Sequence, residues 1–154
     1  RDLHSFPTRR SSDLAESESG ALWLINEDGK LLERVEDDGS LTLPRIQGTY
    51  LDLPIPGDPA SFLDSDQGLL GIETAQTIYR QGMQTRITVV DVSDPENLTL
   101  VLEDRLDVQL GIPEDLDYKL LYMVGAADQL DSAARGMLDV SFSQEEKAVY
   151  HPVA

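Results

Sequence analysis

Short runs of apolar and β-branched residues, separated by turn signals, predict that β-strands dominate the chain. Runs at 21–25 and 30–35 flank Asp28-Gly29, a pair typical of a β-hairpin because glycine supplies the positive φ that the turn needs. The same reasoning predicts strands at 86–92, 98–102, 106–110, 137–142 and 147–150. Four prolines between 43 and 59 disfavour helix and central strand alike, so this segment is predicted to be an ordered surface loop.

Two segments carry apolar residues at helical spacing. The first predicts a helix over about 65–81, capped at its start by Ser65 or Asp66. The second predicts a helix over about 114–130, just after Pro113, with a stripe formed by Leu116, Leu120, Met123, Val124, Ala127 and Leu130. The predicted fold class is therefore α+β: a mainly antiparallel or mixed twisted sheet, two amphipathic helices packed on it, and a C-terminal hairpin at its edge.

The first fourteen residues are interpreted as a non-native segment. A common short-read sequencing adapter, translated in frame, gives residues 1–14 in order, so we exclude them from fold reasoning and expect them to be loose. The domain is then expected to cover 15–152, and 153–154 to begin a C-terminal tail. Whatever preceded Ala15 in the gene is expected to be missing.

The composition narrows the possible functions. Asp and Glu number 29 against 12 Lys and Arg, a formal charge of −17, which disfavours nucleic acids and anionic membrane surfaces as partners. The chain has no cysteine, and His151 near its end is the only histidine outside residues 1–14. Thiol and Ser-His-Asp catalysis are therefore disfavoured, and we expect no enzyme activity and no cofactor.

One segment has the beginning of a calcium-binding loop. Asp64-Ser65-Asp66-Gln67-Gly68 places its glycine at position 5 rather than 6, and Ala75 stands at position 12 where a calcium loop has glutamate. Capping of the following helix explains these residues better, so no metal site is predicted.

The C-terminal hairpin is the strongest candidate for a functional surface. A closing strand is often an edge strand, which leaves backbone N–H and C=O groups unpaired along one side. Phe142 and Tyr150 flank the turn of this hairpin. The two rings either fill the core of the domain or anchor a strand that another chain adds to the edge, and the sequence leaves both interpretations open.

The order of several short motifs resembles a known family. Leu22–Gly29 followed by Leu43–Gly48 is similar to the opening of the β domain of the bacterial cell-division proteins FtsQ/DivIB. The later motifs of that domain are matched, in the same order, by 100–104, 108–111, 114–120, 138–140 and 148–150. Ser141 stands where some members carry arginine, and Asn26 stands where aspartate is usual.

The resemblance implies a single-pass membrane protein with a transmembrane helix and a POTRA domain upstream, and with this domain on the extracytoplasmic side. It also implies a non-enzymatic scaffold of the divisome that binds FtsB/DivIC-like and FtsL-like proteins during septum formation. In that family the last strand is the docking edge. The partner-binding residues are accordingly expected to be Val140, Ser141, Phe142, Lys147, Val149 and Tyr150.

Two other functions remain open. An extracytoplasmic cell-wall hydrolase or carbohydrate-binding domain would use the acidic loops around Asp64 and Asp91, and would need two carboxyl groups converging in a cleft. A structural domain of a larger secreted protein is the third possibility.

Overall fold

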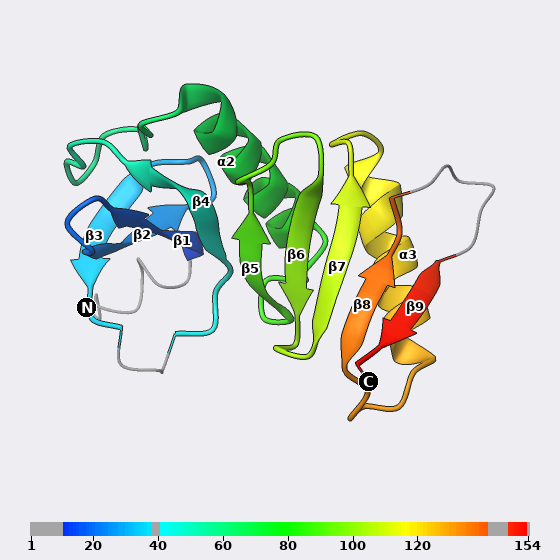
Figure 1. The fold of residues 1–154 in the computed structure, drawn as a ribbon. Helices are drawn as coiled ribbons and strands as arrows, with labels where there is room; N and C mark the ends of the chain where they lie inside the picture. Colours follow the sequence, from blue (N-terminus) through cyan, green and yellow to red (C-terminus); the bar gives the residue numbers. More distant parts are fainter. Residues whose placement is uncertain (1–10, 38–40, 142–147, 154) are drawn as a thin grey trace.

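The computed structural model describes residues 11–37, 41–141 and 148–153. These residues build one mixed sheet of nine strands in the order β3-β2-β1-β4-β5-β6-β7-β8-β9 (Figure 1). The strands are β1 (Ser11–Ser17), β2 (Leu22–Asn26), β3 (Leu31–Val35), β4 (Arg45–Leu51), β5 (Ile87–Asp91), β6 (Leu98–Leu102), β7 (Leu106–Gly111), β8 (Gly136–Asp139) and β9 (Val149–Pro152). The two helices are α2 (Ser65–Arg80) and α3 (Leu116–Asp128).

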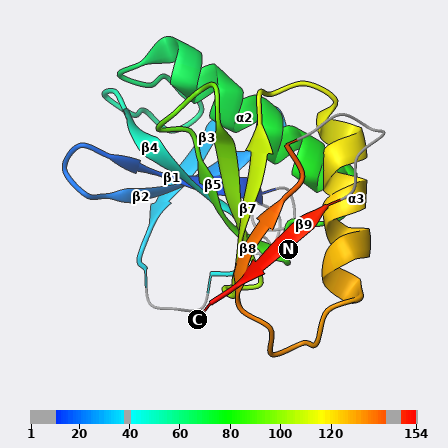
Figure 2. The same ribbon diagram turned by 45° about the vertical axis from the view of Figure 1, so that its right-hand side comes forward.

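Most neighbouring strands are antiparallel, which confirms the predicted α+β class. The pairs β1–β4, β4–β5 and β7–β8 are parallel, and the other five pairs are antiparallel. A parallel pair of consecutive strands needs a crossover connection, and here α2 joins β4 to β5 while α3 joins β7 to β8. Both helices lie on the same side of the sheet, with α3 beside β8 and β9 (Figures 1 and 2).

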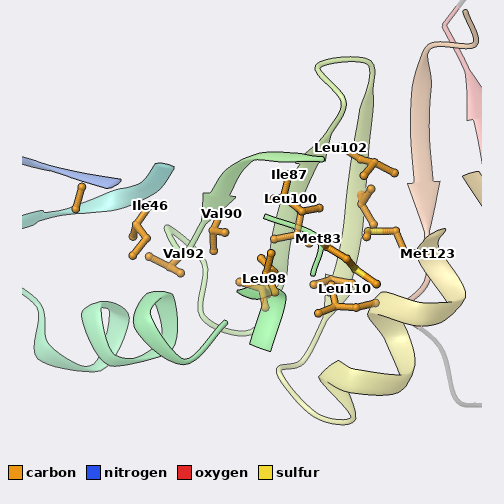
Figure 3. Packing of buried hydrophobic residues seen from close by; sticks show 14 of the residues in the cluster. Ile46, Met83, Ile87, Val90, Val92, Leu98, Leu100, Leu102, Leu110 and Met123 are labelled. Carbon is orange, nitrogen blue, oxygen red and sulfur yellow. The ribbon is translucent and has the colours of Figure 1, made fainter. Parts of the chain in front are cut away.

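The main core lies between the sheet and these helices. Register aligns one buried residue from each of five neighbouring strands, each 1% exposed or less: Ile46, Val90, Leu100, Val108 and Leu138. Met83 and Met123 pack against this row from the helical side (Figure 3). Because side chains alternate along a strand, the residues on either side of each core position face away from the helices.

The prediction of a loop over 43–59 is wrong for its first half. Residues Arg45–Leu51 form β4, a central strand between β1 and β5. Pro44 lies just before the strand, and its carbonyl accepts a hydrogen bond from the Leu14 N–H at 2.8 Å. The other three prolines follow Leu51, so none of the four interrupts the ladder.

The expectation that residues 1–14 are loose is wrong for Ser11–Leu14. They belong to β1, which lies between β2 and β4. Leu14 is buried with Leu22 and Leu24 in a second, smaller cluster on the other side of the sheet. Main-chain hydrogen bonds form with any residue except proline as donor, so a segment of foreign origin can fill this place. The origin of the segment stays a prediction.

The helices are found close to their predicted positions, but their first turns differ. Asp64 caps α2, and its Oδ1 accepts from the Gln67 N–H at 3.0 Å, so neither Ser65 nor Asp66 is the cap. Helix α3 begins at Leu116, two residues later than predicted, because Asp115 adopts a left-handed conformation with φ of 56°. Asp64 as cap accounts for the calcium-loop resemblance without a metal.

Candidate partner-binding edge

Strand β9 is the edge strand at one end of the sheet, which confirms the prediction of a C-terminal hairpin at the edge. It pairs with β8 on one side, and no described residue pairs with its other side. The opposite edge of the sheet is β3, which is partly covered by the chain itself. There the Leu31 N–H donates to the Asp58 carbonyl at 2.9 Å, and the Gly57 N–H donates to the Leu31 carbonyl at 2.8 Å. Of the two edges, β9 is therefore the more accessible to another chain.

The register of β8 and β9 identifies the backbone groups that face outward. The Val153 N–H donates to the Arg135 carbonyl at 3.1 Å, so these two residues form a hydrogen-bonded pair. Such pairs alternate along an antiparallel ladder, which turns the main-chain groups of Val149 and His151 toward β8. The N–H and C=O of Tyr150 consequently point away from the sheet. Pro152 adds only a carbonyl to this outward row.

Gly136 lets the two strands approach closely. Its φ is +145°, and a Cβ built on it would lie 2.1 Å from the His151 carbonyl oxygen and 2.8 Å from the Pro152 Cα. Both neighbours are backbone atoms that cannot turn aside. This glycine is thus required for β9 to pair with β8, and the sequence reasoning missed it. The available signal was a glycine directly before the predicted strand at 137–142.

The predicted partner-binding residues fall into different environments. Val140 is 1% exposed, and its N–H donates to the Gln109 carbonyl, so its side chain belongs to the core. Ser141 is exposed, with its N–H and hydroxyl both directed at Asp139 Oδ1, at 2.9 and 2.5 Å. Val149 is 46% exposed. Phe142 and Lys147 lie outside the described residues.

Tyr150 stands at the border between core and surface. Its register partner is the buried Leu138, so the ring faces the helical side and packs against the main core. The phenolic hydroxyl donates to the Arg135 carbonyl at 2.7 Å, which fixes the direction of the ring. The side chain is nevertheless only half-buried. One part of the ring therefore fills the core while another part stays available for contact.

A buried lysine joins α3 to the end of β7, two strands from the edge. Lys119 Nζ donates to the carbonyls of Leu110 and Ile112, at 2.8 Å each. Burial lowers the pKa of Lys119, while the charges of Asp115 and Glu114 act in the opposite direction. The Leu110 carbonyl belongs to the end of β7 and the Ile112 carbonyl lies just beyond it. A Cβ on Gly111 between them would meet the Ser141 Cβ at 2.7 Å. Lys119 thus joins α3 to the end of β7, where Gly111 lies close to Ser141.

An ionic network fixes the other end of β8. Glu103 accepts hydrogen bonds from the guanidinium groups of Arg86 and Arg105, at 2.8 and 2.9 Å. Partial burial opposes ionisation of Glu103, but the hydrogen bonds from Arg105 and Arg86 lower its pKa below the ordinary value. The hydrogen bond to Asp128 raises the pKa of Arg86. Arg105 also donates to the Ala134 carbonyl at 3.0 Å, just before β8 begins.

The acidic residues named for the hydrolase alternative make local hydrogen bonds. Asp64 caps α2, and Asp91 Oδ1 accepts from both the N–H and the hydroxyl of Ser93. Within 11–37, 41–141 and 148–153, no three His, Asp or Glu side chains are grouped so that they could hold a metal ion. These two carboxylates are thus explained by local structure.

The fold is that of an α+β domain whose terminal strand, β9, pairs with a described strand on one side only. A family model described as "Cell division protein FtsQ/DivIB, C-terminal" matches residues 15–143. The chain belongs to this family, and its role is in cell division. No curated protein matches the chain. The matched residues include β2 to β8 completely and β1 from Ala15 onward, whereas β9 lies beyond the match.

Members of the FtsQ/DivIB family are non-enzymatic division scaffolds that are anchored in the membrane and take part in protein interactions of the divisome. In the segments of this chain that the structure describes, neither helix is long and apolar enough to cross a membrane.

Proposed function

We propose that this domain is a non-enzymatic divisome scaffold that binds FtsB/DivIC-like and FtsL-like proteins by strand addition at β9. Family membership supports the cell-division role. The observation that carries the mechanism is the outward row of main-chain groups centred on Tyr150, at an edge that no described residue covers. Strand addition uses such groups for affinity and the neighbouring side chains for specificity.

The added strand would meet different side chains on the two faces of the sheet. On the helical face it would contact the exposed part of the Tyr150 ring. On the other face it would contact Val149 and His151, which are both exposed. On the helical face of the sheet, an apolar or aromatic side chain of the added strand fits this arrangement. The Tyr150 hydroxyl already donates to the Arg135 carbonyl, so the ring needs no polar partner.

The location of the domain is part of the same proposal. Residues 15–152 correspond to a FtsQ/DivIB β domain outside the cytoplasm, joined through an upstream POTRA domain to a single transmembrane helix. The family match supports this placement.

Hydrogen exchange tests strand addition at single-residue resolution. In the free domain the outward Tyr150 N–H should exchange fast, whereas the inward N–H of His151 should be protected by β8. Adding the extracytoplasmic segment of an FtsB/DivIC-type protein should protect Tyr150 strongly and change His151 little. Binding without protection at Tyr150 would contradict strand addition.

Side-chain substitutions test the aromatic contribution. Phe142→Ala combined with Tyr150→Ala should weaken binding of the same segment, as should charge reversal by Lys147→Glu. Tyr150 is half-buried, and truncating such a side chain also costs stability, so folding is checked first by urea unfolding. Tyr150→Phe is the matched control, because it keeps the ring and should keep most of the affinity. Unchanged affinity in the folded double variant would show that another surface binds the partner.

A further inference from the structure

Exposed apolar side chains occur far from β9, on the connection between β4 and α2 and on the adjoining ends of these two elements. Among the described residues, half of the large apolar side chains that are exposed fall between positions 50 and 69. We call them the β4–α2 surface: Tyr50, Leu53, Ile55, Leu63 and Leu69. Exposed apolar side chains gathered in one region often indicate an interaction surface.

Main-chain hydrogen bonds hold this connection in one conformation. Leu51 and Phe62 form an antiparallel bridge with both side chains buried. The Leu63 N–H donates to the Tyr50 carbonyl at 2.9 Å, so these two residues lie opposite each other. Because neighbouring residues of an extended segment alternate in direction, Tyr50 and Leu63 form an exposed pair on the side away from the core.

Leu53 is the most exposed of these residues, at 84%. Its φ of +46° lies in the left-handed region, which a leucine rarely adopts. Packing of the leucine within the domain does not explain this conformation, since the side chain points into solvent. Backbone strain of this kind tends to persist at functional positions.

Two hollows adjoin the β4–α2 surface. One, of about 250 Å³, is lined by Leu53, Pro54 and the chain's only tryptophan, Trp23. The other, of about 280 Å³, is lined by Leu69 together with Phe62 and Ile72. Apolar side chains of a second molecule would find receiving space beside each exposed leucine.

The charge around the surface is mainly negative, although Lys30 forms a bridge with Pro59 and Arg34 lines the hollow beside Leu53. No lysine or arginine occurs between Ile46 and Tyr79. The same stretch contains five exposed acidic residues: Asp52, Asp58, Asp64, Asp66 and Glu73. An anionic lipid surface or a nucleic acid would be repelled, whereas a segment carrying Lys or Arg beside its apolar residues would be attracted.

We propose that the β4–α2 surface docks an amphipathic segment of a second protein, with apolar side chains on Leu53 and Leu69 and basic side chains toward the acidic rim. This site is separate from β9, because the strands β5, β6, β7 and β8 lie between β4 and β9 in the sheet. An experiment that contradicts strand addition at β9 would therefore leave this proposal unaffected, and the reverse also holds.

A designed peptide tests the proposal. The probe is an amphipathic leucine–lysine helix of about five turns, titrated into the full chain and followed by amide chemical shifts and by the single Trp23 indole signal. The shifts should concentrate in 46–72 and at Trp23. Leu53→Ser combined with Ile55→Ser should weaken binding at least about tenfold, because apolar anchors dominate such interfaces.

Matched controls separate this site from general attraction to an acidic protein. Ile112→Ser with Leu121→Ser removes two similarly exposed residues elsewhere, and should change the affinity less than about twofold. A leucine–glutamate peptide should not bind. The proposal is overturned if both double variants weaken binding equally, if the acidic peptide binds as well, or if the shifts spread over the whole domain. Binding of the chain to phosphatidylcholine vesicles through Leu53 would equally overturn it in favour of a lipid surface.

Discussion

Replacing Gly136 by alanine should detach β9 from the sheet. The added Cβ would lie 2.1 Å from the His151 carbonyl oxygen, more than 1 Å inside normal contact, and the residue would have to keep a φ of +145°. Holding a residue other than glycine in such a region costs about 1–3 kcal/mol. Because the closest atoms belong to the backbone, the strain can be relieved only by moving β9.

The domain should lose only part of its stability, because β9 can detach while the rest of the sheet stays folded. The strand has four residues, and only Tyr150 among them packs against the core. Each main-chain hydrogen bond contributes about 0.5–1.5 kcal/mol net, and release returns conformational entropy to the strand. We therefore expect the free energy of unfolding to fall by about 1–3 kcal/mol, together with fast exchange of the His151 N–H and loss of the proposed partner binding.

Gly125→Ala is the matched control. Gly125 lies in α3, and a Cβ built on it meets no atom within 4 Å. Alanine is favoured over glycine inside a helix by about 0.5–1 kcal/mol, so this variant should be more stable than the unsubstituted chain. Urea unfolding and hydrogen exchange measure both variants. If Gly136→Ala keeps full stability and a protected His151, the deduced closeness of β8 and β9 is incorrect.

Three further predictions concern the supports of the sheet. Lys119→Met leaves the buried Leu110 carbonyl without its charged donor and should lower the free energy of unfolding by about 2 kcal/mol in urea. Asp64→Ala removes the cap of α2 and should cost about 1 kcal/mol, measured in the same way. The pKa of Glu103 is lowered on folding, so its contribution to stability is present at neutral pH and is lost as the pH falls below about 4.5 through the folded-state pKa. Glu103→Gln should therefore make stability less dependent on pH in this range, whereas an unchanged slope in pH-dependent thermal unfolding would exclude this role.

The periodicity of apolar residues predicted most helices and strands, because each of these elements buries one face. The row containing Val90 and Leu100 is visible as alternation, and the Asp28-Gly29 turn has its own signal. Strand β4 was missed because Gly48 and the nearby prolines weaken the pattern, while its pairing depends on distant strands. Such non-local pairing carries no local signature, so propensity alone assigns the segment to a loop.

The candidate edge was only partly predictable. The C-terminal position of β9 suggested an edge, but the direction of the Tyr150 main chain follows from its register against β8, which the sequence does not contain. The burial of Val140 could have been inferred from alternation with Leu138. The role of Gly136 depends on the approach of a second strand, and the strain at Leu53 depends on the path of the chain. Neither of these two features could be predicted from the sequence, because both depend on the three-dimensional path of the chain.

The unbroken sheet acts as a spacer of defined width. Between β4 and β9 lie five inter-strand spacings, which at about 4.8 Å each amount to roughly 24 Å. A helix with its side chains is about 10–12 Å across, so a segment at the β4–α2 surface and a strand at β9 would not collide. Two ligands should therefore bind simultaneously and without competition, and the domain would set the distance between them.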